Sequence, residues 1–415
     1  MSKWIQRATV NLLSLILLGV MGAEAQTLTT IHDFGSGSDG ENPQAGVVFD
    51  QTGNLYGTAA LGALNGNGVV YSLTPDGGTG FTEVILHKFT GPPDGSVPVS
   101  SVVLTAPGRL IATTLEGGAN DMGSAFEVRF ATNADAPARE RVLYSFGSFN
   151  GDGIHPNAAL LPAGQRFFGV TRDGGANGRG TVFQLRPPRS GGDWTETVLY
   201  SFTGSGDAAF PSSDLVIDKA GNLYGTTLVG GVNDLGAVYQ LSPPATEGGT
   251  WTETVIFSFS GSDGTLPFGR LQFDQNGLLY GTTSGGGDLQ AGTVFRLTPP
   301  AEPGTSWIES VLYSFSGGRD GGSPVAGVII DNKGRLFGTA STGGSGGPDF
   351  GGVIFKLTPP QNQGDPWTET VLHSFGGPDG FRSLARLVRR GNGLYGTTSA
   401  GGLNGTGTAF VLTTP

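Results

Sequence analysis

The stretch GNLYGTT at residues 221–227 decides the fold. Leu223, Tyr224 and the two threonines favour an extended chain, whereas Gly225 in the middle has no side chain to pack and weakens a strand. The stretch recurs with small changes at intervals of 55 to 58 residues. Its central position is filled in turn by Gly57, Ala112, Gly169, Gly225, Gly281, Gly338 and Gly396. Seven copies of one unit fill the chain, so the fold is an array of repeats.

Each unit contains four apolar runs, which are clear in the sixth unit at 323–331, 334–340, 351–360 and 366–375. Gly, Asp, Asn and Pro separate the runs, as between short strands. The fourth run begins with Thr-Glu-Thr in several units, which suggests an exposed edge. Small residues in the second run and aromatic residues in the fourth suit sheets that converge on an axis and splay outward. The sequence predicts an all-β fold, a seven-bladed β-propeller of four-stranded antiparallel blades, in which the central glycines let adjacent blades approach near the axis.

The two ends of the repeat array predict how the ring closes. Residues 28–34, LTTIHDF, match a fourth strand, and the last residues, 407–415, match a third strand. The N-terminal segment is therefore expected to complete the seventh blade, which removes an open sheet edge. We expect residues 26–415 to form one domain.

The first 25 residues have the pattern of an export signal. Lys3 and Arg7 precede an apolar run from Leu12 to Val20, and Ala23-Glu24-Ala25 offers a small-x-small cleavage site. The run is too short to span a bilayer comfortably. We expect residues 1–25 to be removed and the protein to be exported, either extracellular or periplasmic.

Composition excludes several function classes. The chain has no cysteine, which excludes disulfides, thiol catalysis and cysteine-ligated zinc. Without residues 1–25 it carries 21 basic and 33 acidic residues, a net charge of −12. Nucleic acid and anionic membrane surfaces are therefore unsuitable partners. We expect a monomer with no membrane span.

The repeated motifs also carry a family resemblance. GNLYGTT, GTVFQL (180–185) and ETVLYSF (196–202), with the spacing from Asp-Gly to Pro, resemble the repeats of choice-of-anchor tandem repeat GloVer-containing proteins, the Gloeo_Verruco type of bacterial envelopes. The likeness covers about residues 27–415. It implies an exported protein of unassigned activity, often with a C-terminal anchoring tail, which we do not expect here because the last repeat reaches Pro415. The region 324–337 is more loosely similar to NHL-type propeller blades.

Histidine is scarce, and three of the four residues occupy one repeat position. His32, His87 and His373 fall where other units have tyrosine or phenylalanine, and we interpret them as packing residues. His155, in DGIHP, lies outside that position and is a candidate binding residue. A G-x-S-x-G match at 343–347 has no helix after it, and we interpret it as chance.

Four arginines mark the seventh unit. Asp-x-x-Gly ends the first strand in four other units, but this unit has Arg390 there, together with Arg382, Arg386 and Arg389. One interpretation is a divergent terminal repeat. The other is an anion site near the channel.

The most regular polar feature is an aspartate before each first strand, followed four residues later by proline in six units. These aspartates are Asp39, Asp94, Asp152, Asp207, Asp263, Asp320 and Asp379. Aspartate and proline are ordinary turn formers. The alternative is that this face binds a ligand, and seven carboxylates would attract a cationic group or weakly hold a divalent ion. No other cofactor, no dedicated metal site and no catalytic residue is predicted.

These observations favour an exported ligand-binding or protein-interaction module, for a carbohydrate, a peptide or a cationic ligand. The alternative is an extracellular polysaccharide hydrolase or lyase on a propeller scaffold, which needs a non-repeating cluster of carboxylate, His or Tyr at the mouth. Asp152 with His155 is the one hint of such a cluster. A purely structural envelope protein is a third hypothesis and predicts no ligand.

Overall fold

The computed structural model describes residues 26–414, apart from positions 36, 38, 64, 79, 132–136, 190–191, 205, 247, 303–305, 346–350 and 363. The predicted export signal lies outside the described residues, and so does part of the G-x-S-x-G match. The described residues form 34 strands and no helix. Among them, no helix of a length and hydropathy suited to crossing a membrane is found.

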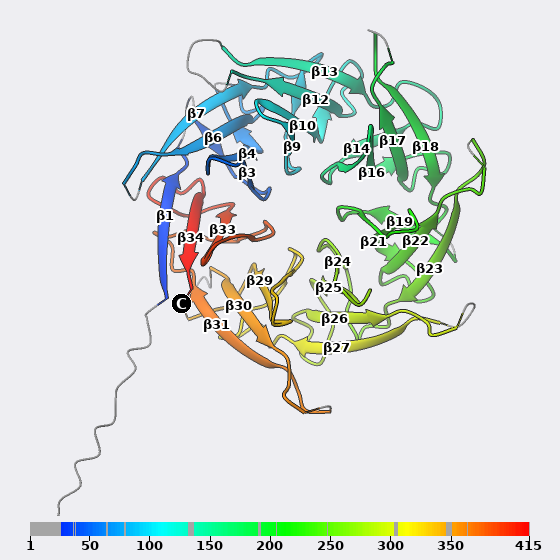
Figure 1. Cartoon of the computed structure of the whole chain (residues 1–415), viewed down its shortest axis with the longest axis vertical. Coiled ribbons are helices and arrows are strands. Elements are labelled where there is room, and N and C mark those ends of the chain that lie inside the picture. Colours follow the sequence, from blue (N-terminus) through cyan, green and yellow to red (C-terminus); the bar gives the residue numbers. More distant parts are fainter. Residues whose placement is uncertain are drawn as a thin grey trace, which may run out of the picture.

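Seven antiparallel four-stranded blades surround a central axis, as Figure 1 shows, so the predicted seven-bladed propeller is confirmed. The first, innermost strands are β3 (Val48–Phe49), β9 (Val103–Ala106), β15 (Leu161–Ala163), β20 (Val216–Ile217), β24 (Gln272–Phe273), β28 (Ile329–Ile330) and β32 (Val388–Arg390). The second strands are β4 (Leu55–Ala59), β10 (Arg109–Thr114), β16 (Arg166–Gly174), β21 (Leu223–Gly230), β25 (Leu279–Thr283), β29 (Leu336–Ala340) and β33 (Gly393–Thr398).

The outer half of each blade consists of its third and fourth strands. The third strands are β6 (Val69–Pro75), β12 (Ser124–Arg129), β17 (Thr181–Arg186), β22 (Ala237–Ser242), β26 (Thr293–Thr298), β30 (Val353–Thr358) and β34 (Thr408–Thr413). The fourth strands are β7 (Phe81–Lys88), β13 (Arg139–Ser145), β18 (Thr195–Ser201), β23 (Thr252–Ser258), β27 (Ile308–Ser314), β31 (Thr368–Ser374) and, for the seventh blade, β1 (Thr27–Asp33).

Short pairings tie the connections between blades to the loops between second and third strands. β2 (Gly40–Glu41) pairs with β5 (Leu61–Gly62), and β8 (Gly95–Ser96) pairs with β11 (Glu116–Gly117). β14 (Gly153–Pro156) and β19 (Ala208–Pro211) instead pair with the extended ends of β16 and β21. Both kinds of loop therefore lie on one face of the disc, which we call the loop face.

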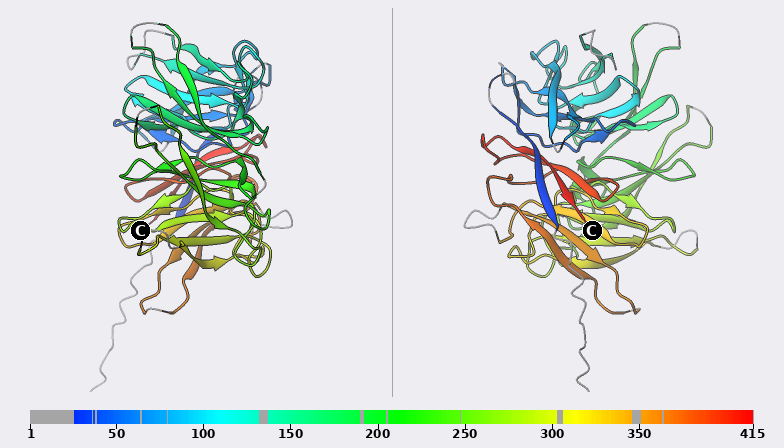
Figure 2. Two further views of the ribbon diagram at one scale, coloured as in Figure 1. Left: turned by 90° about the vertical axis from the view of Figure 1, so that its right-hand side faces the viewer. Right: turned by 60° about the vertical axis from the view of Figure 1, so that its left-hand side comes forward.

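The ring closes through its N-terminal strand, as predicted. β1 pairs with β34 along its length, from Thr27 with Thr413 to Asp33 with Thr408. Figure 2 shows this strand lying against the red C-terminal strand at the rim of the disc. Phe34, the residue after β1, is fully buried and packs against Tyr71 of the first blade. Closure thus joins the two ends of the chain and covers the outer edge of β34.

The central glycines have a different role from the one predicted. A Cβ on Gly225 would lie 2.5 Å from the Tyr239 hydroxyl oxygen, and Tyr239 is its cross-strand partner within the same blade. Its φ is not in the left-handed region. The glycine makes room for a buried ring that lies across it, and it does not serve a close approach of neighbouring blades. In the second blade, Ala112 faces Phe126, a ring without a hydroxyl group.

Neighbouring blades are instead joined near the axis by threonine. In six blades the residue after the central position donates a hydrogen bond from its hydroxyl to a backbone carbonyl of the next connection. The pairs are Thr58 with Ser100, Thr113 with Ala158, Thr226 with Pro267, Thr282 with Ala326, Thr339 with Ala385 and Thr397 with Ala45. Because these threonines are fully buried, the bonds fix each connection against the preceding blade.

Candidate functional site

The seven predicted aspartates lie at the junctions between blades, on the loop face. Each one accepts a hydrogen bond of 2.7 to 3.0 Å from a backbone N–H three or four residues before it. This geometry is that of an aspartate that caps its own turn. Turn formation was one of the two interpretations that the sequence allowed, and ligand binding was the other. The residue three positions after each aspartate has a φ between +51° and +57°, a conformation that is rare without glycine.

Five of these aspartates also contact the tyrosine or histidine at the repeat position that the sequence analysis interpreted as packing. Tyr144, Tyr200 and Tyr313 donate their hydroxyls to Asp152, Asp207 and Asp320 over 2.7 to 3.0 Å. His87 and His373 lie 3.1 and 2.6 Å from Asp94 and Asp379. The histidines also pack edge-on against the phenylalanine two residues later, so the packing role is confirmed. The hydrogen bond to aspartate was missed.

A buried or half-buried glutamate completes six of the seven junctions. Glu196, on β18, is 9% exposed and lies near Asp152, which is 4% exposed. Burial, and then the Asp152 charge, raise the pKa of Glu196 to about 8. The equivalent residues are Glu83, Glu140, Glu253, Glu309 and Glu369, whose pKa values burial also raises, to between about 7 and about 8. The prediction that this part of the fourth strand is an exposed edge is therefore wrong for the glutamate.

A β-bulge lets one strand serve two junctions. On β18, Leu199 is skipped by the pairing between Val182–Tyr200 and Phe183–Val198. An extra residue turns the side chains beyond it to the other side of the strand. Glu196 accordingly faces the preceding junction, and Tyr200 faces the following one.

His155 does not join Asp152. Its Nδ1 lies 3.0 Å from Asp173 Oδ2, and Asp173 also accepts a hydrogen bond from Arg172 Nε at 2.8 Å. Asp152 binds Tyr144 and Ser148 instead. Asp152 and His155, the pair that suggested a catalytic cluster, therefore have different partners. His155 and Arg172 both contact Asp173.

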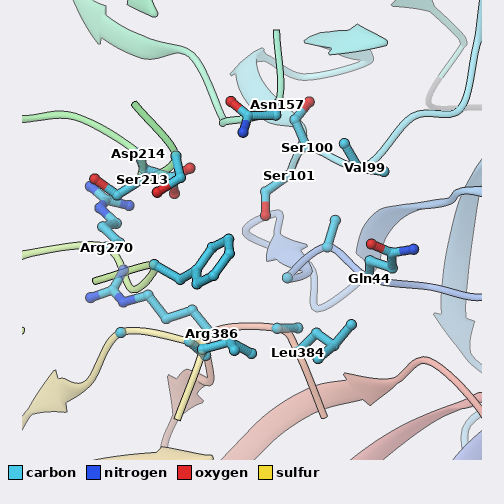
Figure 3. Close-up of a pocket in the computed structure, with 18 of the residues that line it drawn as sticks. Gln44, Val99, Ser100, Ser101, Asn157, Ser213, Asp214, Arg270, Leu384 and Arg386 are labelled. Carbon is cyan, nitrogen blue, oxygen red and sulfur yellow. The ribbon is translucent and has the colours of Figure 1, made fainter. Parts of the chain in front are cut away.

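All seven units line a pocket on the axis at the loop face, with a cavity volume of about 370 Å³. Its residues come mainly from the connections, five to seven positions after the aspartates. Figure 3 shows Arg270 and Arg386 on one side of this axial pocket, with Ser101 and Asn157 across from Arg386. A second cavity of about 380 Å³ shares five of these residues and continues against the apolar first strands.

Four charged residues line the axial pocket, and two of them, Arg270 and Arg386, are arginines with an unpaired nitrogen. The Nε atoms of Arg270 and Arg386 are buried and have no hydrogen-bond partner in the described part of the chain. Arg386 donates through Nη2 to Gln272 at 2.5 Å. Burial, and then Arg270, lower the pKa of Arg386 to about 10, while the charge of Asp214 acts in the opposite direction. Both side chains therefore have an unused donor available to a ligand.

The predicted arginine cluster of the seventh unit is only partly assembled. Arg389 lies over the Phe337 ring and 3.6 Å from Asp331, and Arg390 donates to the backbone of Asp50 and Gln51. Arg382 is exposed. Of the four, Arg386 alone lines the axial pocket. The sequence analysis missed Arg270, which lines the pocket together with Arg386. Both arginines stand seven residues after the aspartate of their unit, so an alignment of the seven connections would have revealed Arg270.

The loop face carries most of the exposed large hydrophobic side chains. Eight of the eleven exposed large hydrophobic side chains in the described part of the chain lie on loop-face loops. They are Leu61, Met122, Phe149, Val232, Leu266, Phe268, Leu289 and Leu403. Exposed apolar groups gathered on one face are typical of a binding surface.

The model of the Gloeobacter/Verrucomicrobia repeat matches the chain four times, at residues 20–187, 82–272, 136–345 and 245–415. The chain belongs to this repeat family. The resemblance seen in the motifs is thereby confirmed. No curated protein matches the chain at a significant level.

Several solved structures share the propeller. An ancestral GH74 enzyme aligns over 94% of this chain and 51% of its own, with a TM-score of 0.60 and 13% identity. A putative 6-phosphogluconolactonase from Bacteroides uniformis aligns over 89% and 98%, with a TM-score of 0.55 and 15% identity. The extracellular domain of a putative one component system from B. thetaiotaomicron aligns over 94% and 42%, with a TM-score of 0.54 and 12% identity. At these identities the likeness shows the fold alone.

Proposed function

We propose that this family member is an exported ligand-binding module whose axial pocket receives an anionic group of an extracellular ligand. The observation that carries the proposal is the pair of buried, unpartnered guanidinium Nε atoms of Arg270 and Arg386. The whole chain has a net charge of −11. Two arginines at the axis therefore form a local positive site on a protein whose overall charge is negative. Arginine is well suited to carboxylates, which it binds with two parallel hydrogen bonds.

The rest of the pocket favours an acidic sugar as the ligand. Gln44, Ser101 and Asn157 line it and offer hydroxyl and amide groups to sugar hydroxyls. Phe268, 37% exposed, adds an aromatic face. A cavity of about 370 Å³ is within the range of small-molecule sites. The predicted export signal, residues 1–25, supports an extracellular or periplasmic encounter with glycans.

Cation binding by the loop aspartates and His155 stays a prediction. Each aspartate already accepts a hydrogen bond from its own loop, which leaves less capacity for a ligand. The axial pocket is therefore the site that we favour.

A lyase acting on an acidic polysaccharide is the second candidate. His155 is held by Asp173, and Arg172 lines the pocket, so a base oriented by a carboxylate lies near the cationic site. Hydrolysis by two carboxylates finds less support, because Asp214 is the one carboxylate among the described residues that line the axial pocket.

The proposal is tested by calorimetry with matched oligosaccharides, one series containing uronic acids and the other their neutral counterparts. We expect binding of the acidic series with a preference of about tenfold or more, as charge-assisted hydrogen bonds contribute about 1.5–3 kcal/mol. Equal binding of both series, or none by the folded protein, would refute an anion site. Absorbance of an unsaturated product in the same samples would indicate the lyase.

A further inference from the structure

Two consecutive blade junctions bring one imidazole and two carboxylates together. His32, Asp39 and Glu83 meet between the seventh and first blades, and the next junction holds His87, Asp94 and Glu140. In each group one nitrogen and two carboxylate oxygens lie within 4.8 Å of one another. In each group the histidine lies near the end of one fourth strand, the aspartate follows it in the connection, and the glutamate comes from the fourth strand of the next blade.

In the first group the imidazole nitrogen lies near both carboxylates without a hydrogen bond to either. His32 Nε2 lies 3.6 Å from Asp39 Oδ2 and 3.6 Å from Glu83 Oε1, too far for hydrogen bonds. His32 Nε2 and Glu83 Oε1 are both buried atoms with no hydrogen-bond partner. Tetrahedral zinc, with bonds of about 2.0–2.2 Å to nitrogen and oxygen, holds its ligand atoms about 3.3–3.6 Å apart. The two spacings from His32 match that geometry, and all three ligand atoms lie within 4.8 Å of one another.

The second group has the same three residue types on the next pair of strands, but here the imidazole is hydrogen-bonded to the aspartate. His87 Nε2 lies 3.1 Å from Asp94 Oδ2, and Glu140 Oε1 is a buried atom without a hydrogen-bond partner.

The other five junctions each lack one ligand, which makes the two groups distinct. Tyr144, Tyr200 and Tyr313 replace the histidine with a phenol, and Phe257 replaces it with a ring that has no polar atom. His373 and Asp379 form the seventh junction, but Leu28 stands at the glutamate position. Histidine with two carboxylates therefore occurs at two of the seven junctions.

We propose that His32, Asp39 and Glu83, and likewise His87, Asp94 and Glu140, bind one zinc-class divalent cation each. Imidazole with carboxylates suits zinc, and three protein ligands leave a fourth position for water. The first ion would connect β1, the strand that closes the ring, to β7 of the first blade. In a chain without cysteine, such an ion supplies a cross-link at the closure seam. The proposal is independent of the axial pocket.

The test is a zinc titration of the metal-stripped protein by calorimetry, together with the Tm at each zinc concentration. We expect two ions per chain and a Tm that rises with zinc. His32→Tyr and Glu140→Gln should each remove one ion. Tyrosine is already present at three junctions, so His32→Tyr keeps the ring packing and a hydrogen bond to Asp39. His373→Tyr and Glu253→Gln are the matched controls, and both should retain two ions.

Two results would overturn the proposal. One is a folded parent that binds no zinc. The other is a stoichiometry that stays the same in His32→Tyr and in Glu140→Gln, which would place any bound zinc elsewhere. Cobalt provides an independent readout in the same variants, since a protein-held ion of low coordination number gives intense visible absorption and the hydrated ion does not. Loss of that absorption in the control variants instead would likewise contradict the assignment.

Discussion

The blade junctions and the axial pocket are built from the same connecting segments, yet they differ in how similar their residues are from one unit to the next. At the junctions every unit has its aspartate and six of seven have the glutamate. Seven residues after the aspartate, the chain reaches the axis, and the repeat is lost. The residues there are Gly46, Ser101, Ala159, Asp214, Arg270, Gly327 and Arg386.

This difference separates two tasks of one segment. Ring building requires the same contact seven times, so the aspartate recurs in every unit and the glutamate in six. A ligand on the axis contacts each unit once, and the pocket residues are free to differ. Small residues remain one position earlier, where the carbonyls of Ser100, Ala158 and Ala326 accept the threonine hydroxyls. Along each connection, the change from residues that recur in the units to residues that differ between them therefore takes place within a few positions.

Removing residues 27–34 should have the largest effect on the ring. The deletion exposes the edge of β34 and removes the buried side chains of Ile31 and Phe34. Loss of one buried phenylalanine alone costs about 3–5 kcal/mol, so we expect aggregation or a Tm lower by about 10 °C or more. Calorimetry and size-exclusion chromatography measure this. A shortened chain that melts like the parent would show that closure does not depend on β1.

Gly225→Leu should have the next largest effect, by overpacking one blade. Its side chain would collide with the Tyr239 ring, and overpacking costs about 1–3 kcal/mol. Gly225→Ala should cost less, because Ala112 is accommodated opposite Phe126 in the second blade, and its cost should change when it is combined with Tyr239→Phe. Urea unfolding of the single and double variants measures the coupling. Additive losses would mean that the glycine and the ring do not meet.

Because burial raises the pKa of the junction glutamates, we expect the stability of the folded protein to fall as pH rises. The native pKa of Glu196 is about 8, above its value of about 4.3 in an unfolded chain. The native state therefore binds more protons between these values, and the stabilisation is complete below the lower pKa and lost as pH rises through the upper one. We expect the Tm to decrease by several degrees between pH 5 and pH 9.

Glu196→Gln combined with Glu253→Gln should flatten that decrease, since an amide does not titrate. Asp94 and Asp379 have the opposite pH dependence, because their pKa values are lowered in the folded protein. Hydrogen bonds from histidine and from the backbone outweigh burial and lower the pKa of both, so their stabilisation is lost only at more acidic pH. A parent whose Tm is constant or rises from pH 5 to pH 9 would contradict the protonated glutamates.

The smallest effect should distinguish two aspartates of the same ring. Asp207 accepts hydrogen bonds from Tyr200, Thr203 and the Ala208 backbone, whereas Asp263 accepts only from Ser260 among the described residues. We expect Asp207→Asn to cost about 1–2 kcal/mol and Asp263→Asn less than about 1 kcal/mol. Chemical denaturation compares them. The reverse order would mean that the aromatic partner contributes nothing.

The sequence predicts the fold well because each repeat carries its own strand and turn signals. The 55–58-residue period, GNLYGTT and the strand-like residues 28–34 were sufficient for the blade number and the closing strand. The role of Gly225 was predicted wrongly because its partner ring lies on another strand, and no local pattern states which residues face each other.

The candidate site was less accessible to sequence. Glu196 looks like part of a polar strand end, and its burial becomes evident only when the next blade covers it. Arg270 and Arg386 are 116 residues apart in numbering and meet only because the ring brings the fifth and seventh connections to one axis. The polar partners of the histidines were likewise hidden, since His87 and Asp94 are joined across a turn.

The most direct test of the account is the affinity for an acidic oligosaccharide of two variants that lose the same charge. Arg386→Gln removes a guanidinium from the axial pocket, and Arg382→Gln removes an exposed one four residues earlier on the same connection. The account predicts an affinity about 10- to 100-fold lower for Arg386→Gln and close to that of the parent for Arg382→Gln. Equal losses in the two variants, or no loss in either, would contradict an axial binding site.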